Sequence, residues 1–249
     1  MPYSYFEDYI RWNLVGKNYT VIRNTRELSV PSVPWVFQGV FVINQAPRSY
    51  WSVAPTVPHY LINMEQCSNK DHLSRLLKEL SNERYSGLID YSEANVRWSG
   101  IEETTVVLMK RSVSSGDCTK EYDVAFVGLL NDRRNHILQS LVERGVSVRH
   151  IRGWGRNRDK EIAKARVLVN IHYSENYLVF ESIRCLPWMG REDIVVISED
   201  SEPDRLTPWV YTCAYDDLVQ STLDALNDPQ GFRRDPPPVD TILLTDVLD

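Results

Sequence analysis

The second half of the chain alternates apolar runs with amphipathic segments, a rhythm that predicts strands and helices in turn. Residues 122–128 form a short apolar run that ends in glycine, as a buried strand does. Residues 131–143 carry apolar side chains at helical spacing, and Gly145 closes the segment. Strands that alternate with helices pair in parallel, so this half predicts an α/β domain. Further strands are expected at 146–150, 167–171 and 194–198, and further helices at 159–165, 178–186 and 215–226.

The first half follows the same pattern less regularly. Its clearest helical pattern covers residues 70–80, where four leucines share one face. The polar stretch 112–119 is typical of a linker. We therefore predict two small α/β domains, residues 1–116 and 117–228, with parallel sheets flanked by helices and a ligand cleft between them. A proline-rich tail at 229–249 is expected on the surface, and the strands of the first half are expected at 19–22, 35–43, 60–62, 88–89 and 105–108.

Composition narrows the class of protein. Apolar residues make up 43% of the 249 and charged residues 25%, which is typical of a globular chain rather than a disordered one. No apolar stretch is long enough for a transmembrane segment, and the first residues lack the basic and apolar regions of a secretory signal. The four cysteines form no Cys-x-x-Cys pair, which argues against structural zinc and a disulfide framework. We expect a soluble, cytoplasmic protein.

Charge is concentrated in one segment of an otherwise acidic chain. The net charge is −6, which speaks against a nucleic-acid partner. Residues 133–166 nevertheless contain ten Lys and Arg against three acidic residues. Such a segment indicates either a focused site for a small anion or a solvated basic face.

Two glycine-containing turns could meet a phosphate. Gly128 ends the first strand of the second domain, and Arg133 and Arg134 follow in the first turn of a helix, where free N–H groups and guanidinium forks suit an anion. The alternative is a plain turn with two solvated arginines. The loop 153–158 is either a cationic phosphate loop or an ordinary surface loop. The loop has the pattern Gly-x-Gly-x-x-Arg, with arginine where the dinucleotide-binding fingerprint has a third glycine or alanine, so it is weak evidence for a dinucleotide. Its candidate residues are Gly153, Trp154 and Arg158.

A third group of candidates follows the strand expected at 167–171, at the edge of a parallel sheet where ligands bind. Glu181 is expected in the first turn of the next helix, where its carboxylate could accept both hydroxyls of a ribose. The alternative is that His172 is a hydrogen-bonded core residue and that Glu181 only interacts favourably with the helix dipole. The other members of this group are His172, Tyr173, Ser174 and Glu175.

The order of these motifs over residues 122–199 resembles the donor-binding half of a GT-B glycosyltransferase. The matching features are Val-Gly-(x)4-Arg, a Gly-rich loop, Val-Leu-Val-Asn-Ile-His, Phe-Glu-Ser-Ile-Arg and Ile-Val-Val-Ile-Ser. The resemblance implies two Rossmann-like domains and a nucleotide-diphosphate sugar as donor. It implies diphosphate contacts at Gly128, Arg133 and Arg134 and a ribose contact at Glu181, the second glutamate of a Glu-(x)7-Glu motif. The first glutamate would fall at Tyr173, so that part of the motif is absent, and Glu175 is the nearest acid.

Catalytic candidates lie at strand ends in the first half. An inverting transferase needs a base within reach of the acceptor hydroxyl, and Glu65, Asp90 and Glu93 are the acids that could serve. Each could instead be a turn or cap residue. The chain lacks an Asp-x-Asp pair, so we expect no metal and cationic side chains in its place.

The function that follows is the transfer of a sugar from a nucleotide-diphosphate donor to a glycan or another hydroxyl acceptor, as in polysaccharide biosynthesis, with no cofactor beyond the donor. Two alternatives stay open. One is a nucleotide or nucleotide-sugar binding protein without transferase activity. The other is an NAD-dependent oxidoreductase, which the incomplete glycine pattern disfavours.

Overall fold

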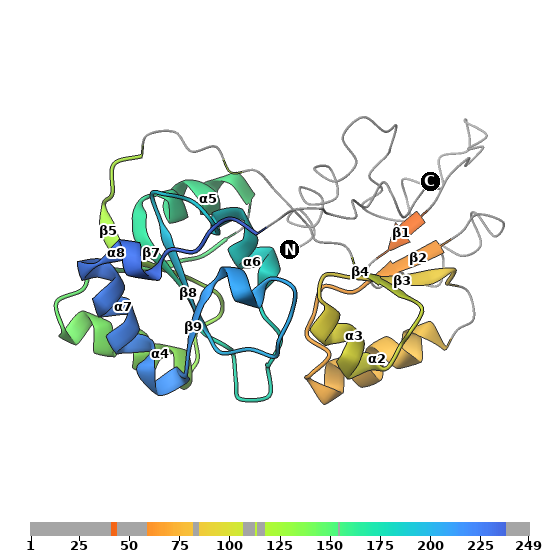
Figure 1. Cartoon of the computed structure of the whole chain (residues 1–249). Coiled ribbons are helices and arrows are strands. Elements are labelled where there is room, and N and C mark those ends of the chain that lie inside the picture. The colour runs from red at the N-terminus through yellow and green to blue at the C-terminus, as the bar shows by residue number, and fades with distance from the viewer. Residues whose placement is uncertain are drawn as a thin grey trace, which may run out of the picture.

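The computed structural model describes residues 41–43, 59–81, 85–106, 113, 118–153 and 155–237. Within them the chain forms two parallel β-sheets, each flanked by helices (Figure 1). The α/β class with two parallel sheets is therefore confirmed, whereas the boundaries at 116 and 228 stay predictions. The strand expected at 19–22, most of 35–43, Trp154 and the chain beyond residue 237 lie outside the described residues.

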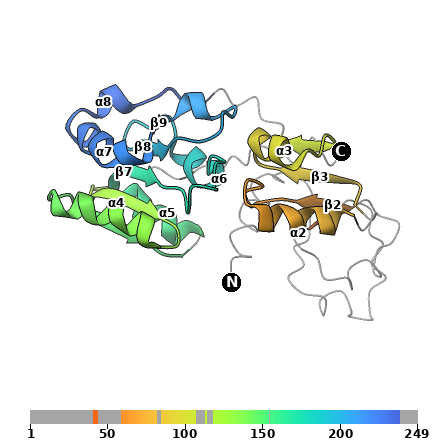
Figure 2. The same ribbon diagram turned by 90° about the horizontal axis from the view of Figure 1, so that it is seen from below.

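The first sheet has the order β1-β2-β3-β4, with every neighbouring pair parallel. Helices α2 and α3 lie on one face of it (Figures 1 and 2). Asn69 and Ser92 cap these helices by accepting backbone N–H groups of the first turn. A small core around Leu61, Leu76 and Leu88 holds the layers together. The elements are β1 (Phe41–Ile43), β2 (His59–Ile62), α2 (Lys70–Leu80), β3 (Gly87–Asp90), α3 (Glu93–Ser99) and β4 (Thr104–Val106).

The second sheet has the order β6-β5-β7-β8-β9, again parallel throughout. Because successive strand residues point to opposite faces, β5 feeds two core layers: Val124 and Phe126 pack in one, Ala125 and Val127 in the other. Helices α4, α7 and α8 lie on the first side and α5 and α6 on the second (Figure 1). The strands are β5 (Tyr122–Val127), β6 (Val148–Ile151), β7 (Ala165–Asn170), β8 (Val195–Glu199) and β9 (Tyr211–Cys213). The helices are α4 (Asp132–Glu143), α5 (Gly155–Ala163), α6 (Ser182–Cys185), α7 (Leu218–Asn227) and α8 (Pro229–Phe232), with 3-10 turns η3 (Leu186–Trp188), η4 (Thr207–Trp209) and η5 (Tyr215–Asp217).

Two expected elements differ from the structure. The loop predicted at 153–158 is wrong in its second half, because α5 already begins at Gly155. The helix predicted at 178–186 is wrong in its first half, since α6 covers only Ser182–Cys185. The N–H groups of Leu178 and Val179 instead donate to side chains that follow β2, so this stretch is held by tertiary bonds in place of a helix ladder.

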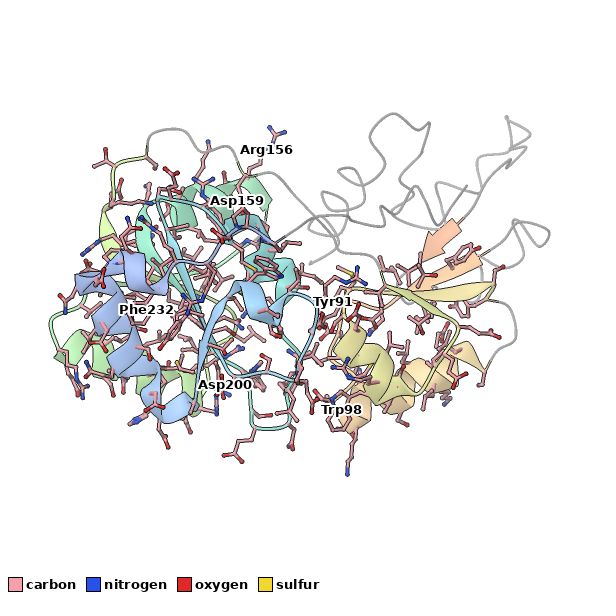
Figure 3. All side chains as sticks on the ribbon, in the orientation of Figure 1. Tyr91, Trp98, Arg156, Asp159, Asp200 and Phe232 are labelled. Atoms are coloured by element: carbon pink, nitrogen blue, oxygen red, sulfur yellow. The ribbon has the colours of Figure 1, made fainter. Side chains whose placement is uncertain are left out.

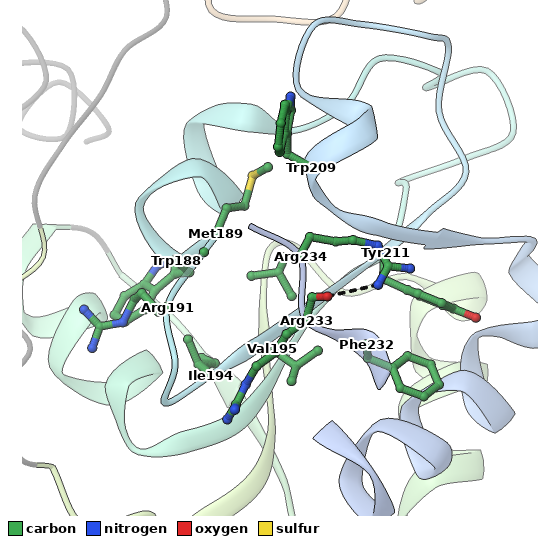
Figure 4. A pocket seen from close by; sticks show the side chains of 12 residues that line it. Trp188, Met189, Arg191, Ile194, Val195, Trp209, Tyr211, Phe232, Arg233 and Arg234 are labelled. Atoms are coloured by element: carbon green, nitrogen blue, oxygen red, sulfur yellow. Dashed lines mark hydrogen bonds between the residues drawn. The ribbon is translucent and has the colours of Figure 1, made fainter. Parts of the chain in front are cut away.

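The end of the described chain folds back onto the second sheet. After α8, the segment 233–237 passes Gly190, where an added Cβ would lie 2.4 Å from Pro236 Cα. A narrow pocket lies beside this segment, lined by side chains that include Trp188, Trp209 and Arg234 (Figure 4). Among the residues described here, none of the helices combines the length and the apolar content that crossing a bilayer requires.

Candidate functional site

The segments that follow the strands of the two sheets meet one another. We call this contact the junction and define it by residues 63–69 and 90–97 on one side and 177–184 and 203–205 on the other. Buried Tyr91, next to the end of β3, lies where the two parts face each other (Figure 3). The junction therefore brings together the edges at which parallel sheets bind their ligands.

Gln66 makes the central contact of the junction. Its side chain is 97% buried, since only 3% of the residue is exposed. Its Nε2 donates to Glu181 Oε1 at 2.7 Å, and its Oε1 accepts from the Val179 N–H at 2.9 Å. Ser68 and Asn69 continue the contact through bonds to Leu178 N and the Tyr177 hydroxyl, at 3.1 and 2.6 Å.

Glu181 stands at the N-cap position of α6, just before the first turn in which the sequence predicts it, and makes no capping bond. Its side chain is 26% exposed, and Oε2 lies 3.5 Å from Arg184 Nη2. Arg184 in turn donates to Asn170 Oδ1 at 2.8 Å, at the end of β7. Glu181 is thus a half-buried carboxylate held between an amide and a guanidinium group.

Among the three catalytic candidates, Glu65 is the one whose carboxyl pKa is raised by the charge of Glu181. Glu65 is an exposed residue, but the protein atoms around its carboxyl exclude part of the solvent, and this desolvation raises the pKa of the carboxyl. The charge of Glu181 raises the pKa further, and the charge of Arg75 lowers it. Burial and the Glu181 charge also raise the pKa of the Tyr91 phenol. The carboxylates of Glu65 and Glu181, from opposite sides of the junction, therefore repel each other.

Asp90 lies inside the first domain rather than on its surface. Only 1% of the residue is exposed, and its carboxylate accepts from Asn63 Nδ2, Asn95 Nδ2 and Ser92 N at 2.7, 3.0 and 2.9 Å. Burial raises its pKa to about 7 despite these donors. Asn63 also accepts from the Glu65 N–H at 3.1 Å. The structure thus makes Asp90 the anchor of the loops that carry Glu65 and Ser92.

Glu93 belongs to a second contact of the junction. It begins α3 and forms an ion pair with Arg205 at 2.6 Å. Beside it, the Ser92 hydroxyl donates to Asp204, which also accepts the Ala94 N–H at 3.2 Å. The structure therefore does not bring the three predicted catalytic acids together: Glu65 lies beside Glu181, Asp90 is enclosed, and Glu93 holds the far contact.

Arg133 and Arg134 are engaged by protein acceptors. Arg134 is 4% exposed and donates to the carbonyls of Ile171 and Leu129, with bonds of 2.7 to 3.0 Å. Burial, and next the charge of Arg184, lower its pKa to about 10. Arg133 makes a two-pronged ion pair with Glu199 and stacks on the Tyr215 ring, 3.8 Å from its centroid. The alternative of two solvated arginines is wrong, and a phosphate contact stays a prediction.

Gly128 makes room for this arrangement. Its φ of 147° favours glycine, and an added Cβ would lie 3.0 Å from Arg134 Nη1. Next to it, Leu129 is 77% exposed, and His150 Nε2 lies 2.8 Å from the Gly128 carbonyl. The glycine that the sequence assigns to a ligand thus also serves the packing of Arg134.

The group after β7 divides into buried and exposed members. His172 is 2% exposed, and its Nε2 lies 3.0 Å from both Asp200 O and Ser201 Oγ. Burial lowers the pKa of the imidazole, which favours the neutral form. Its buried Nδ1 has no hydrogen-bond partner in the part of the chain that the structure describes. Tyr173 and Glu175 are exposed, and Ser174 is partly buried.

The candidates of the 153–158 segment are not among the residues that define the junction. Arg158 lies within α5 and is 2% exposed, with Nε 3.6 Å from Asp159 Oδ1, so the expectation of a surface loop is wrong there. Gly153 has a φ of 101°, and Trp154 lies outside the described residues. Over the described ranges, no three His, Cys, Asp or Glu side chains gather in a group that could hold a metal ion.

The sequence places Gln66 among the polar residues at a strand end and Arg184 within a motif, but it predicts neither residue's partner. Gln66 follows Glu65 in a polar run after a predicted strand, and that position was the available signal. Arg184 lies within the Phe-Glu-Ser-Ile-Arg motif, but its partner Asn170 is fourteen residues away. Neither partner can be found from spacing alone, because both bonds depend on how the strands are arranged.

No family model matches the chain. It is similar to three proteins of Acanthamoeba polyphaga mimivirus whose names state no activity. "Uncharacterized protein L140" is 34% identical over 188 residues, 68% of this chain and 59% of that protein. "Uncharacterized protein L137" is 31% identical over 185 residues, 68% of this chain and 25% of that protein. "Uncharacterized protein L138" is 42% identical over 114 residues, 43% of this chain and 13% of that protein. The chain thus spans well under two thirds of each of these relatives.

Proposed function

We propose that the protein is a metal-independent glycosyltransferase of the GT-B type, which moves a sugar from a nucleotide-diphosphate donor to a glycan or another hydroxyl acceptor. The observation that carries the proposal is the junction: the loops after the strands of two parallel sheets meet at Glu181. Glu181 is also the residue that the resemblance pairs with the donor ribose. We propose a cytoplasmic location, where nucleotide sugars serve polysaccharide synthesis.

The donor side of the proposal rests on charge. Burial lowers the pKa of Arg134 most, and the charges of Arg184 and Arg133 lower it further by repulsion, against the charge of Glu181. An anion placed beside this group would relieve that repulsion, and a departing nucleotide diphosphate develops negative charge in the transition state. The N-terminus of α4, next to Gly128, adds backbone N–H groups on the same edge. These features support a leaving group stabilised without a metal.

The acceptor side rests on Glu65. A general base must reach the hydroxyl it deprotonates, and its proton affinity must suit the working pH. Glu65 is an exposed residue, and the partial desolvation of its carboxyl and the nearby charge of Glu181 both raise its pKa. We assign Asp90 and Glu93 to positioning the loops on either side of it, because both are occupied by protein partners.

The binding test is a titration of the protein with UDP, GDP, CDP, dTDP, NAD and ATP. Glu181→Gln keeps the shape of the side chain but removes the charge that a ribose diol would meet. We expect it to weaken nucleotide-diphosphate binding by about 1.5–3 kcal/mol, the scale of hydrogen bonds to a charged group. The matched control is Glu143→Gln, an exposed acid at the end of α4 that belongs to none of the candidate groups. Equal affinity in wild type and Glu181→Gln would remove the ribose assignment.

Turnover separates the proposal from its alternatives. We expect donor hydrolysis or sugar transfer that persists in chelator and falls in Glu65→Gln. Tight binding of a nucleotide diphosphate without either reaction would identify a binding protein. Binding of NAD in preference to the diphosphates would support the oxidoreductase.

A further inference from the structure

The Gln66 carboxamide presents one donor and one acceptor side by side, and both are used across the junction. The donor meets the Glu181 carboxylate at 2.7 Å and the acceptor meets the Val179 N–H at 2.9 Å. A sugar hydroxyl offers the same pair, since it can donate to a carboxylate and accept from an N–H. Gln66 therefore makes, from within the chain, the contacts that a ribose hydroxyl would make at this position.

We infer that Gln66 is an internal competitor of the nucleoside diphosphate: it fills the ribose position at Glu181 and must leave before the nucleotide binds. The inference rests on the proposed function, because it takes Glu181 as the ribose ligand. It follows from the burial of Gln66 and from its side-chain bonds, which among the described residues are both made across the junction.

The neighbouring contacts define what moves. Ser68 and Asn69 bind the backbone of Leu178 and the hydroxyl of Tyr177, so the segment 66–69 contacts the second domain as a unit. The contact of Glu93 with Arg205 lies on another loop and involves none of these residues. Segment 66–69 can thus separate while the second contact still joins the domains. Because Glu65 precedes this segment directly, entry of a nucleotide also shifts the proposed base.

The test compares the affinity of the full chain for UDP and GDP, by calorimetry, in four proteins. Gln66→Ala and Gln66→Met both remove the competing donor and acceptor, and the methionine keeps the side-chain volume if the alanine variant does not fold. We expect both to bind the better diphosphate about tenfold more tightly than wild type, the effect of removing one hydrogen bond of about 1.4 kcal/mol. The control Tyr177→Phe removes the hydroxyl that Asn69 binds, a bond of the same segment that does not touch Glu181 and leaves the cap of α2 in place, and we expect it to stay within about twofold.

The outcomes separate the inference from the function on which it rests. Equal or weaker binding in Gln66→Met overturns the competition and leaves the nucleotide site standing. An equal gain in Tyr177→Phe also overturns it, because loosening of the junction would then explain the result. Absence of binding in all four proteins overturns both the competition and the proposed function.

Discussion

At the scale of single residues, the chemistry of this chain is decided by which partner reaches a polar group first. Arg134 has the residue type and position of a phosphate ligand, yet the Ile171 carbonyl takes two of its donors. Asp90 has the type of a catalytic acid, yet three nearby donors enclose it. In both cases the chain itself supplies what a ligand would otherwise offer: backbone carbonyls for Arg134, and two side-chain amides and one backbone N–H for Asp90.

Replacing Arg134 with alanine should therefore cost stability whether or not a ligand is present. The change leaves the carbonyls of Ile171 and Leu129 without their buried donors, and we expect a loss of about 1–3 kcal/mol per carbonyl in the free energy of unfolding. Urea unfolding measures it. The control is Arg156→Ala, an exposed arginine at the start of α5 (Figure 3), which should change stability by less than about 0.5 kcal/mol. A ligand-free Arg134→Ala protein as stable as wild type would contradict the structural role.

Asp90 should make the stability of the protein depend on pH. Its pKa is about 7 in the folded chain, against about 3.9 in an unfolded one. Between these values the folded state holds a proton that the unfolded state has lost, so the free energy of unfolding should fall as the pH rises from about 4 to about 7. Above pH 7 this contribution is constant.

The measurement is urea unfolding at several pH values in wild type and Asp90→Asn. The asparagine cannot ionise, so we expect the downward slope, at most about 1.4 kcal/mol per pH unit from one group, to be smaller in the variant. Parallel pH profiles for the two proteins would show that Asp90 does not titrate in this range.

At the scale of elements, the sequence predicts best where a segment folds by its own pattern. The helix expected at 70–80 is α2 itself, because an asparagine cap and a leucine face define it locally. The long strands β5, β7 and β8 follow from apolar runs that both layers bury. The edge strand β9, with three residues, carries no such pattern.

The missing first half of the helix expected at 178–186 and the unpredicted partners of the site residues share one cause. The stretch before α6 has helical spacing, but Gln66 and Ser68 bind its N–H groups from the other domain. For the same reason the sequence locates the candidate site after β7 but not the partners within it. Residue type and strand ends indicate where ligands gather, while the bonds that occupy Arg133, Arg134 and Glu181 arise only on folding.

The segment after α8 gives a prediction at this scale. Gly190→Ala adds a methyl group 2.4 Å from Pro236 Cα, at a φ of 70° that favours glycine. We expect it to destabilise the protein by about 1–3 kcal/mol and to release the segment 233–237, because a packed neighbour must move. Gly145→Ala is the control: its φ is 82°, but nothing lies within 4 Å, so it should show the backbone cost of about 1 kcal/mol alone.

The rate of trypsin cleavage measures the release of the segment 233–237, since Arg233 and Arg234 lie within it. Cleavage there should be faster in Gly190→Ala than in Gly145→Ala at equal overall stability. The same cleavage rate in both variants would mean that the segment does not depend on the contact at Gly190.

At the scale of the whole molecule, the two domains differ from their junction in the kind of force that holds them. The second sheet buries two apolar layers whose members lie at or beyond residue 113. The junction is made of hydrogen bonds and an ion pair between Glu93 and Arg205, whose side chains are 36% and 43% exposed. Exposed pairs of this kind contribute at most about 1 kcal/mol. The junction also contains the buried hydrogen bonds of Gln66, and such bonds contribute about 0.5–3 kcal/mol each. The domains should therefore separate at lower cost than either core unfolds.

A fragment of residues 113–237 should accordingly fold alone and keep the nucleotide site. It contains both apolar layers, the arginine group and Glu181, and it lacks Gln66 and Glu65. Because the internal competitor is absent, we expect the fragment to bind UDP or GDP at least as tightly as the full chain. Sugar transfer should be lost, since the proposed base and acceptor side are missing. Circular dichroism reports the fold and calorimetry the affinity. A folded fragment that binds no nucleotide diphosphate, beside a full chain that does, would place the site on the first domain and contradict the assignment of the donor to the second.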